Sequence, residues 1–256
     1  MSLAKLAFVI AVKNGAETIE ACLDSLAPAL ADGAKLYVYD SLSTDGTQSI
    51  ITSRFPKALY TCKKDEGLYY AWNLAIVEVA EPYLLFINCD DTLHSLSNLR
   101  GILADLEENS EAVASSGQTV MTRLDGVTRY AGTRLKRDWF VGDMPIVTPA
   151  TIFTVRALRE LDGFDTRYRI SADYDLALRM LARYGHKALL FRPLHILRFS
   201  LGGMSNKHRK QAFTEIYYIV KRNLSQVKLA LHVLSYAGIQ LKRTLLSIYF
   251  MFRSKR

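Results

Sequence analysis

The sequence lacks the features that mark several common protein classes. Its 256 residues include only 3 cysteines, which are too few and too widely spaced for a disulfide framework or a zinc site. It has no low-complexity segment and no internal repeat that would divide it into small units. No apolar stretch reaches the roughly 18 uninterrupted residues of a membrane-spanning helix. We therefore expect a globular protein in which Cys22, Cys62 and Cys89 are reduced, buried thiols.

Two glycine-rich phosphate-binding motifs are also missing. No Gly-x-Gly-x-x-Gly follows the first apolar run, and no Gly-x-x-x-x-Gly-Lys-[Ser/Thr] occurs anywhere. The dinucleotide-binding and P-loop classes therefore lose their main support. A sugar nucleotidyltransferase would need a glycine-rich and basic loop here, and Lys13-Asn14-Gly15 is not such a loop. A diphosphate held through a metal ion is the phosphate-binding option that remains.

Net positive charge is absent from most of the chain and concentrated at its end. From residue 207 onward the chain has 11 Lys and Arg against one acid, Glu215, whereas the rest has 22 basic and 24 acidic residues. A main domain that reads DNA would itself be basic, so the tail points to an anionic membrane surface or partner. Met1 to Val12 has no cleavable signal pattern, and we expect a cytoplasmic protein.

What is present is an alternation of strand and helix patterns. Half of the residues are hydrophobic, enough for one large core. Apolar runs typical of buried strands alternate with helical spacing of apolar residues four times before residue 91. The strands are expected at 6–12, 35–40, 59–62 and 83–88, and the helices at 17–26, around 50–51 and at 68–80. This order predicts an α/β fold with a largely parallel, doubly wound sheet.

Acidic residues follow three of these strands. They are Asp40, Asp65 and the pair Asp90-Asp91. Ligands of open α/β sheets bind outside the carboxyl ends of the strands, and carboxylate oxygens are ligands for hard divalent cations. The alternative is that these acids only turn the chain and cap helices, as Asp often does. The pattern favours an acidic crevice along one edge of the sheet.

Four segments resemble, in order and spacing, the motifs of inverting nucleotide-sugar glycosyltransferases of family 2, which have the GT-A fold. They are the strand at 8–14, Asp40-Ser41-Leu42-Ser43-Thr44-Asp45-Gly46-Thr47, the segment from Asp65 to Asn73, and Asn88-Cys89-Asp90-Asp91. A later segment, from Gly163 to Leu176, resembles the G-F-D-x-x-Y-x-I-x-A-D-Y-D-L motif of the bacterial branch that builds surface polysaccharides. The resemblance implies a GT-A domain, with a mixed, mostly parallel sheet flanked by helices, over residues 1–205.

The resemblance also implies the site. Asp173 matches the general base that deprotonates the acceptor hydroxyl, and Asp91 matches the ligand of an Mn²⁺ or Mg²⁺ cofactor. Gly202, Gly203 and Ser205 match a G-G-x-S segment near the diphosphate or acceptor, although a plain turn would have the same composition. The residues implied to bind the nucleotide sugar are Ala11, Val12, Asp40, Asp65, Asp90 and Asp91.

The residues around Asp173 are consistent with this assignment, although without the resemblance they favour an acid that only stabilises the helix start. Leu176, Leu178, Met180 and Leu181 indicate an amphipathic helix with Asp173 in its first turn, where the helix dipole favours an ionised carboxylate. Asp175 points to a different side of this helix, and we do not expect it to be the base.

The implied function is transfer of a sugar from a nucleoside diphosphate, with a UDP-sugar expected, to a saccharide or lipid-linked saccharide. No Q-x-x-R-W segment follows the base, which implies single additions.

Three segments depart from the branch pattern: Tyr70 stands where the family usually has Asp, Ser41-Leu42 replace small glycines, and Val147-Thr148-Pro149-Ala150 replaces a C-H-Q-A-like segment. The alternative function is therefore a nucleotide-sugar-binding or scaffold protein without turnover.

Residues 206–256 are predicted to form a basic, amphipathic helical tail. Phe213, Ile216, Tyr217 and Val220 fall at helical spacing, and the apolar stretches beyond them are separated by Lys242-Arg243. This composition is typical of a helix in the headgroup region of an anionic membrane, here the cytoplasmic face of the inner membrane. The alternative is that these helices pack on the main domain or on another subunit.

Overall fold

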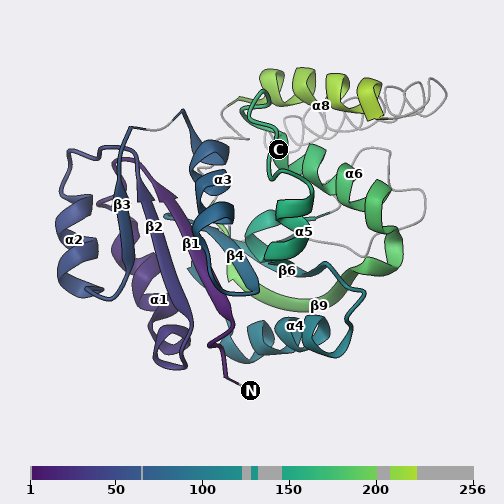
Figure 1. The fold of residues 1–256 in the computed structure, drawn as a ribbon. Coiled ribbons are helices and arrows are strands. Elements are labelled where there is room, and N and C mark those ends of the chain that lie inside the picture. The colour runs from purple at the N-terminus through teal and green to yellow at the C-terminus, as the bar shows by residue number, and fades with distance from the viewer. Residues whose placement is uncertain (1, 65, 123–127, 132–145, 201–207, 224–256) are drawn as a thin grey trace, which may run out of the picture.

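The computed structural model describes residues 2–64, 66–122, 128–131, 146–200 and 208–223 (Figure 1). The elements in chain order are β1 (Leu6–Val12), α1 (Ile19–Ala31), β2 (Lys35–Asp40), α2 (Thr47–Arg54), β3 (Leu59–Cys62), α3 (Leu68–Glu78), β4 (Tyr83–Asn88), β5 (Thr92–Leu93), α4 (Leu96–Glu108), β6 (Ala114–Thr122), β7 (Thr128–Ala131), η1 (Thr148–Ala150), β8 (Thr151–Thr154), α5 (Val155–Glu160), α6 (Ala172–Tyr184), η2 (His186–Ala188), β9 (Leu189–Arg198) and α8 (Arg209–Asn223).

In this part of the chain, nine strands form one mixed sheet in the order β3-β2-β1-β4-β8-β6-β9-β5, with β7 paired to β6. The first four strands pair in parallel because the helices α1, α2 and α3 connect each of them to the next. Strand β8 runs antiparallel to both β4 and β6, whereas β6 and β9 are parallel. The predicted α/β fold and mixed sheet are confirmed, and parallel pairing dominates in the N-terminal half.

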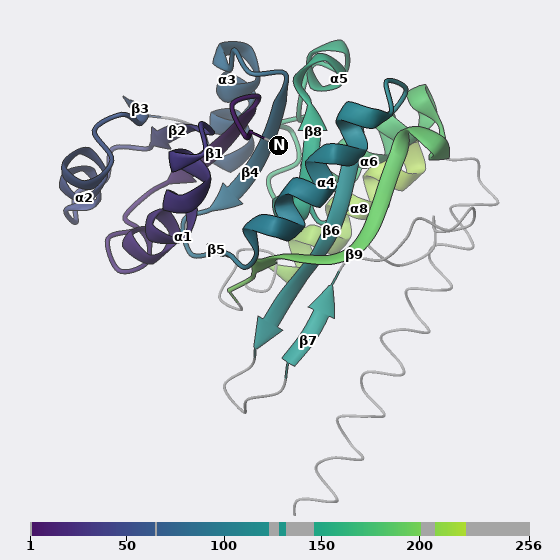
Figure 2. The same ribbon diagram turned by 90° about the horizontal axis from the view of Figure 1, so that it is seen from below.

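Helices cover both faces of the sheet, and strand alternation explains the two cores. In β1, Ala7 and Val9 point to the face covered by α3, α5 and α6. Leu6, Phe8 and Ile10 point to the opposite face, which packs against α1, α2 and α4. Figure 2 shows α1 and α4 on this second face. All five side chains are fully buried, as continuous apolar strands of a two-sided sheet should be.

The strand register brings the predicted site residues to one edge of the sheet. Val12 at the end of β1 pairs with Asp40 at the end of β2, and Ala11 pairs with Asn88 at the end of β4. Asp90 and Asp91 follow directly after β4. The carboxyl ends of β2 and β4, on either side of β1, therefore carry Asp40 and the Asp90-Asp91 pair, whereas the third predicted acid, Asp65, lies outside the described residues.

Helix α8 packs against the main domain (Figure 1). Its Ile219 and Val220 are fully buried and form a small core with Tyr174 and Leu178 of α6. For residues 209–223 the packing alternative therefore holds, and the rest of the predicted tail lies outside the described residues. None of the helices in the described ranges combines the length and apolar character that are needed to cross a bilayer.

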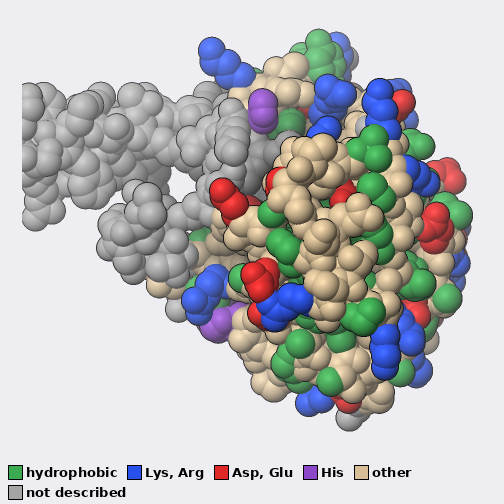
Figure 3. Space-filling model, turned by 90° about the vertical axis from the view of Figure 1, so that its left-hand side faces the viewer, with side chains coloured by type: hydrophobic (Ala, Val, Ile, Leu, Met, Phe, Trp, Pro, Cys, Tyr) green, Lys and Arg blue, Asp and Glu red, His purple; other side chains and the backbone are tan. Residues whose placement is uncertain are grey.

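The three cysteines are free, but one prediction about them was wrong. Cys22 is buried and Cys89 is partly buried, whereas Cys62 is exposed. The reason is that Cys62 ends β3, the edge strand of the sheet, whose residues are exposed or only partly buried. Figure 3 looks onto the side of the molecule where α2 and β3 lie, and shows basic and acidic side chains interspersed among apolar and neutral ones.

Candidate functional site

The loops after β1 and β2 are tied together by side-chain hydrogen bonds. Asn14 has a φ of 52°, a left-handed conformation that Asn adopts more readily than most residues. Its side chain and neighbouring amides then contact the Ser43–Thr47 segment. The contacts are Asn14 N to Ser43 Oγ at 2.8 Å, Thr44 N to Asn14 Oδ1 at 2.9 Å, Gly15 N to Thr47 Oγ1 at 2.9 Å and Ala16 N to Asp45 Oδ2 at 2.9 Å.

Asp40 lies beneath these loops and is only 1% exposed. Its Oδ1 accepts hydrogen bonds from the backbone N and Oγ of Ser43, at 2.8 and 2.6 Å. Its Oδ2 accepts from the hydroxyl of Tyr60 at 2.6 Å. Both carboxylate oxygens are therefore used to shape the loop after β2, and direct contact of Asp40 with a nucleotide stays a prediction.

Asp91 is a buried carboxylate beside a second acid. It is 1% exposed, and its oxygens accept hydrogen bonds from Asn88 Nδ2 at 2.8 Å and from the backbone N of Ser200 at 2.9 Å. Burial raises the pKa of Asp91 to about 7, and the charge of Asp90 adds to the rise, although the Ser200 hydrogen bond opposes it. The site thus resists carrying two negative charges unless a cation compensates them.

A divalent cation fits this carboxylate pair. Within the described ranges, no Lys or Arg forms an ion pair with Asp90 or Asp91. The described part of the chain also contains no cluster of three or more His, Cys, Asp or Glu side chains that could enclose a metal by themselves. Mg²⁺ and Mn²⁺ sites of nucleotide enzymes commonly use one or two carboxylates and take further ligands from substrate phosphates. Asp90 and Asp91 would be the protein ligands of such an ion.

Asp173 lies in the first turn of α6, as predicted, and is partly exposed. Burial raises its pKa to about 6, against a hydrogen bond from the backbone N of Tyr174 at 2.8 Å and one from the Tyr69 hydroxyl. The negative charge of Glu215 adds to the rise. The helix dipole alone would lower the pKa of Asp173, but burial raises it by more. A base with a pKa near 6 is ionised at neutral pH and still accepts a proton readily.

Two residues of α3 hold the segment that precedes Asp173, and the motifs alone did not show this. The Tyr69 hydroxyl donates to the carbonyl of Ile170 at 2.9 Å, while Asn73 exchanges two hydrogen bonds of 2.8 Å with the backbone of Phe164. Tyr69 and Asn73 are four residues apart and therefore share one face of the helix. That spacing was the available signal that they act on one partner.

Gly163 is required where this segment meets Asn73. Its φ is +65°, in the left-handed region, and a Cβ atom there would lie 2.3 Å from Asn73 Oδ1.

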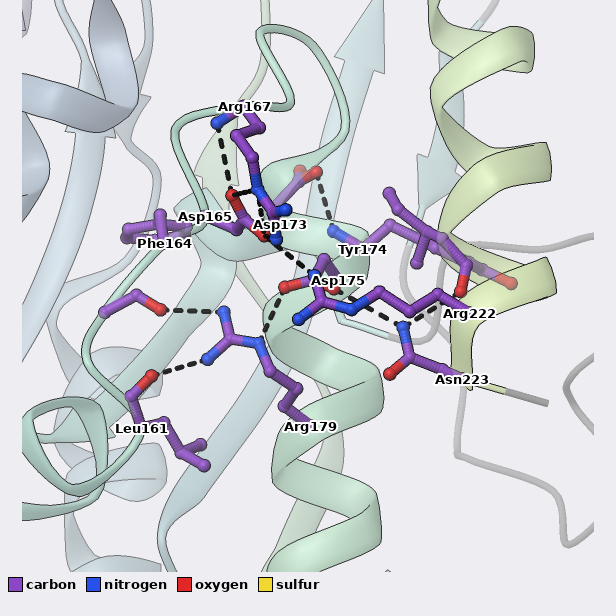
Figure 4. A network of polar contacts seen from close by, with 12 residues as sticks. Leu161, Phe164, Asp165, Arg167, Asp173, Tyr174, Asp175, Arg179, Arg222 and Asn223 are labelled. Carbon is purple, nitrogen blue, oxygen red and sulfur yellow. Dashed lines mark hydrogen bonds and ion pairs between the residues drawn. The ribbon is translucent and has the colours of Figure 1, made fainter.

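Asp175 is 1% exposed and forms an ion pair of 2.6 Å with Arg179, which also donates to the carbonyls of Leu161 and Gly163 (Figure 4). Asp175 thus helps to hold the backbone through Arg179, and the expectation that it is not the base stays a prediction.

The remaining predicted site residues divide into two groups. Ala11 is partly exposed and Val12 is buried at the end of β1, beside Asp40 and Asn88. Asp65, Gly202, Gly203 and Ser205 lie outside the described residues. Of the departures from the family pattern, Tyr70 is 37% exposed, Leu42 is 50% exposed with a φ of 55°, and Thr148 is buried in η1.

Comparisons with known proteins indicate a family and a fold for the chain. A family model described as glycosyl transferase family 2 matches residues 7–160, which is more than half of the chain. Proteins described as PGL/p-HBAD biosynthesis glycosyltransferases, from Mycobacterium bovis and Mycobacterium tuberculosis, are 26% identical over 213 residues, covering 80% of this chain and 81% of theirs.

Solved structures with a similar fold include S. aureus TarS 1–349 in complex with UDP, with a TM-score of 0.66 and 16% identity over 91% of this chain and 71% of that chain. They also include the mannosyltransferase PcManGT from Pyrobaculum calidifontis in complex with GDP-Man and Mn²⁺. Its TM-score is 0.68, with 16% identity over 98% of this chain and 82% of that chain.

Proposed function

The chain belongs to glycosyl transferase family 2 and has the GT-A fold, and from this we propose that it is an inverting, metal-dependent hexosyltransferase. The donor is a nucleoside diphosphate sugar, with UDP as the proposed nucleotide. The observation that carries the proposal is the buried Asp91 beside the partly exposed Asp90, a pair with no ion-pair partner among the described residues, at the same sheet edge as Ala11, Val12 and Asp40. The neighbours in complex with UDP, and with GDP-Man and Mn²⁺, support this reading.

The proposed chemistry assigns one role to Asp173 and another to the pair Asp90-Asp91. Asp173 accepts the proton of an acceptor hydroxyl, whose oxygen attacks the anomeric carbon as the bond to the diphosphate breaks. The nucleoside diphosphate leaves with the bonding electron pair, and the configuration at the anomeric carbon inverts. A cation held by Asp90 and Asp91 would neutralise the charge that develops on the diphosphate.

The proposed acceptor is a saccharide or a lipid-linked saccharide of a bacterial surface polysaccharide. The strongly basic, apolar composition of residues 207–256 supports attachment to the cytoplasmic face of an anionic membrane, where such acceptors are made. Glu215 is the only acid in that stretch. Residues 1–205 form the proposed catalytic domain.

A second candidate function is nucleotide-sugar binding without turnover. The observation in its favour is Tyr70, which stands where family members usually carry an acid and is partly exposed on α3. The loss of an acidic side chain near the nucleotide could reduce activity while donor binding remains.

Nucleotide release separates the two functions. Purified full-length protein is incubated with UDP- and GDP-sugars, a panel of saccharide and lipid-linked acceptors, and Mn²⁺, Mg²⁺ or EDTA. Metal-dependent release of UDP that rises with an acceptor supports the transferase. Saturable binding of UDP without release under any condition supports the binding protein and rejects catalysis.

A further inference from the structure

We propose that Glu215 of α8 is a positioning residue for the catalytic base, because it fixes the backbone that carries Asp173. This inference rests on the proposed role of Asp173 as the base. It also assigns α8 to the catalytic unit, although α8 lies beyond the family motifs and within the predicted tail.

The contact is a carboxylate that accepts hydrogen bonds from three successive amides. Glu215 Oε1 accepts from the backbone N of Arg169 at 3.1 Å, and its Oε2 accepts from those of Ile170 and Ser171, both at 2.9 Å. Glu215 is only 9% exposed, and Gln211 of the same helix donates to its Oε1 at 2.9 Å. Charge-assisted hydrogen bonds in a buried setting are stronger than neutral ones.

The same backbone is held from the other side by α3. The N–H of Ile170 donates to Glu215, and its carbonyl accepts from the Tyr69 hydroxyl at 2.9 Å. Ser171, the N-cap of α6, also donates from its Oγ to the carbonyl of Ala212 at 3.3 Å. The peptide units just before Asp173 are thus fixed between two helices that are far apart in the sequence.

Helix α8 is itself anchored close to this contact. Ile219 and Val220 are buried against Tyr174 and Leu178, one and five residues after Asp173. Figure 4 shows Arg222 and Asn223 reaching from α8 to Asp165 and Asp175, at 3.1 and 3.5 Å. Displacing α8 would therefore move the start of α6 and the base with it.

Glu215 also acts on Asp173 through its charge. Its carboxylate raises the pKa of Asp173, whereas the Tyr69 hydroxyl lowers it. Glu215 lies on α8 and Tyr69 on α3. Loss of the hydrogen-bond acceptor should therefore lower kcat, and loss of the charge should shift the pH profile of kcat. If Glu215 only supported the fold, removing its charge would not shift that profile.

The test compares Glu215→Ala and Glu215→Gln with the wild-type protein. We expect Glu215→Ala to lower kcat by about 10²-fold with little change in the donor KM, because a misplaced base slows chemistry but not donor binding. Glu215→Gln keeps one acceptor oxygen and should recover part of this loss. Its acidic limb in the pH profile of kcat should move to lower pH, because a charge that raises the pKa of Asp173 is gone.

Two controls make the outcome specific. Glu111→Gln removes a charge from an exposed glutamate outside the site and should leave kcat and its pH profile unchanged. In an Asp173→Asn background, Glu215→Ala should cause no further loss of kcat, because no base remains to be positioned. A full additional loss in that background, or unchanged kcat in both Glu215 variants, would overturn the proposal.

Hydrogen exchange keeps the test informative if the wild-type protein proves inactive. In that case the proposed function fails, while the contact itself can still be examined. The amides of Arg169, Ile170 and Ser171 should exchange faster in Glu215→Ala than in the wild type, with α4 unchanged. Unaltered exchange at these amides would show that Glu215 does not hold the segment, whatever the enzyme does.

Discussion

At the scale of single residues, three aspartates of the site have different surroundings and hence different chemistry. Asp40 accepts two hydrogen bonds from Ser43 in the loop after β2 and one from Tyr60 of β3, so it stabilises this loop and its contact with the edge strand. Asp91 is equally buried, but it lies next to another acid and its pKa rises to about 7, which favours a cation. Asp173 is partly exposed with a pKa of about 6, which suits a base. The environment of each aspartate determines its role.

The first prediction concerns Asp91. Asp91→Asn should abolish the tightening of UDP binding by Mn²⁺, because the charge that holds the cation is lost while the amide keeps the shape of the side chain. Calorimetric titrations of UDP with and without Mn²⁺ measure this effect. Tightening by Mn²⁺ that equals that of the wild type would place the metal elsewhere.

The second prediction concerns pH. The proposed base must be deprotonated to act, and burial places the pKa of Asp173 at about 6. At saturating donor and metal, kcat should therefore be constant at neutral pH and fall tenfold per pH unit once the pH drops well below 6. A kcat that stays constant down to pH 4.5 would argue against Asp173 as the titrating group.

At the scale of elements, the site depends on helices that meet at the segment before α6. Residues of α3 bond to Phe164 and Ile170, and Gly163 allows Asn73 to approach closely. In this chain, the motif in α3 therefore holds the backbone that carries the proposed base, Asp173.

The third prediction tests this contact with two glycines that both have positive φ. Gly163→Ala adds a Cβ 2.3 Å from Asn73 Oδ1, whereas Gly185→Ala, with a φ of +77°, meets nothing within 4 Å. Gly185 has a ψ of 173°, which with its positive φ is a conformation that glycine alone adopts readily, so Gly185→Ala should cost about 1–3 kcal/mol of unfolding free energy from backbone strain alone. Gly163→Ala should cost roughly 1–3 kcal/mol more, because the hydrogen bonds of Asn73 are also disturbed. Denaturant unfolding of both variants measures the difference, and equal losses would contradict the clash.

The sequence predicted the first four strands and the acids that follow them because continuous apolar runs and strand ends are local signals. It did not delineate β6, whose Ser115, Ser116 and Thr119 are buried polar residues that read as loop. Ser115 is stabilised there by Asp105 of α4, a contact that no local pattern reveals. The Glu215 contact was missed for the same reason, since its partners are 44 to 46 residues away.

At the scale of the whole molecule, charge and fold divide the chain at different places. The basic region begins near residue 207, but α8 at 209–223 packs on α6 and contacts the segment before the base. The membrane-binding prediction therefore applies to the chain beyond α8. A truncation that removed α8 as well would confuse loss of attachment with loss of activity.

The fourth prediction concerns this distinction. Removing residues 242–256 should release the protein from anionic vesicles and leave UDP affinity intact, and high salt should release the full-length protein in the same way. Each Lys or Arg near such a surface contributes about 1 kcal/mol at low ionic strength. Vesicle flotation at low and high salt measures attachment. Failure of the full-length protein to float, or aggregation after truncation, would instead favour packing of this segment on protein.

The most direct test of inverting transfer by Asp173 is NMR of the anomeric configuration of the product, combined with turnover of Asp173→Asn. From an α-linked donor, the wild-type protein should form a β-linked product. Asp173→Asn should bind UDP normally but turn over about 10²–10⁴ times more slowly, the usual contribution of a positioned base. An α-linked product, or near-normal turnover by Asp173→Asn, would contradict this account.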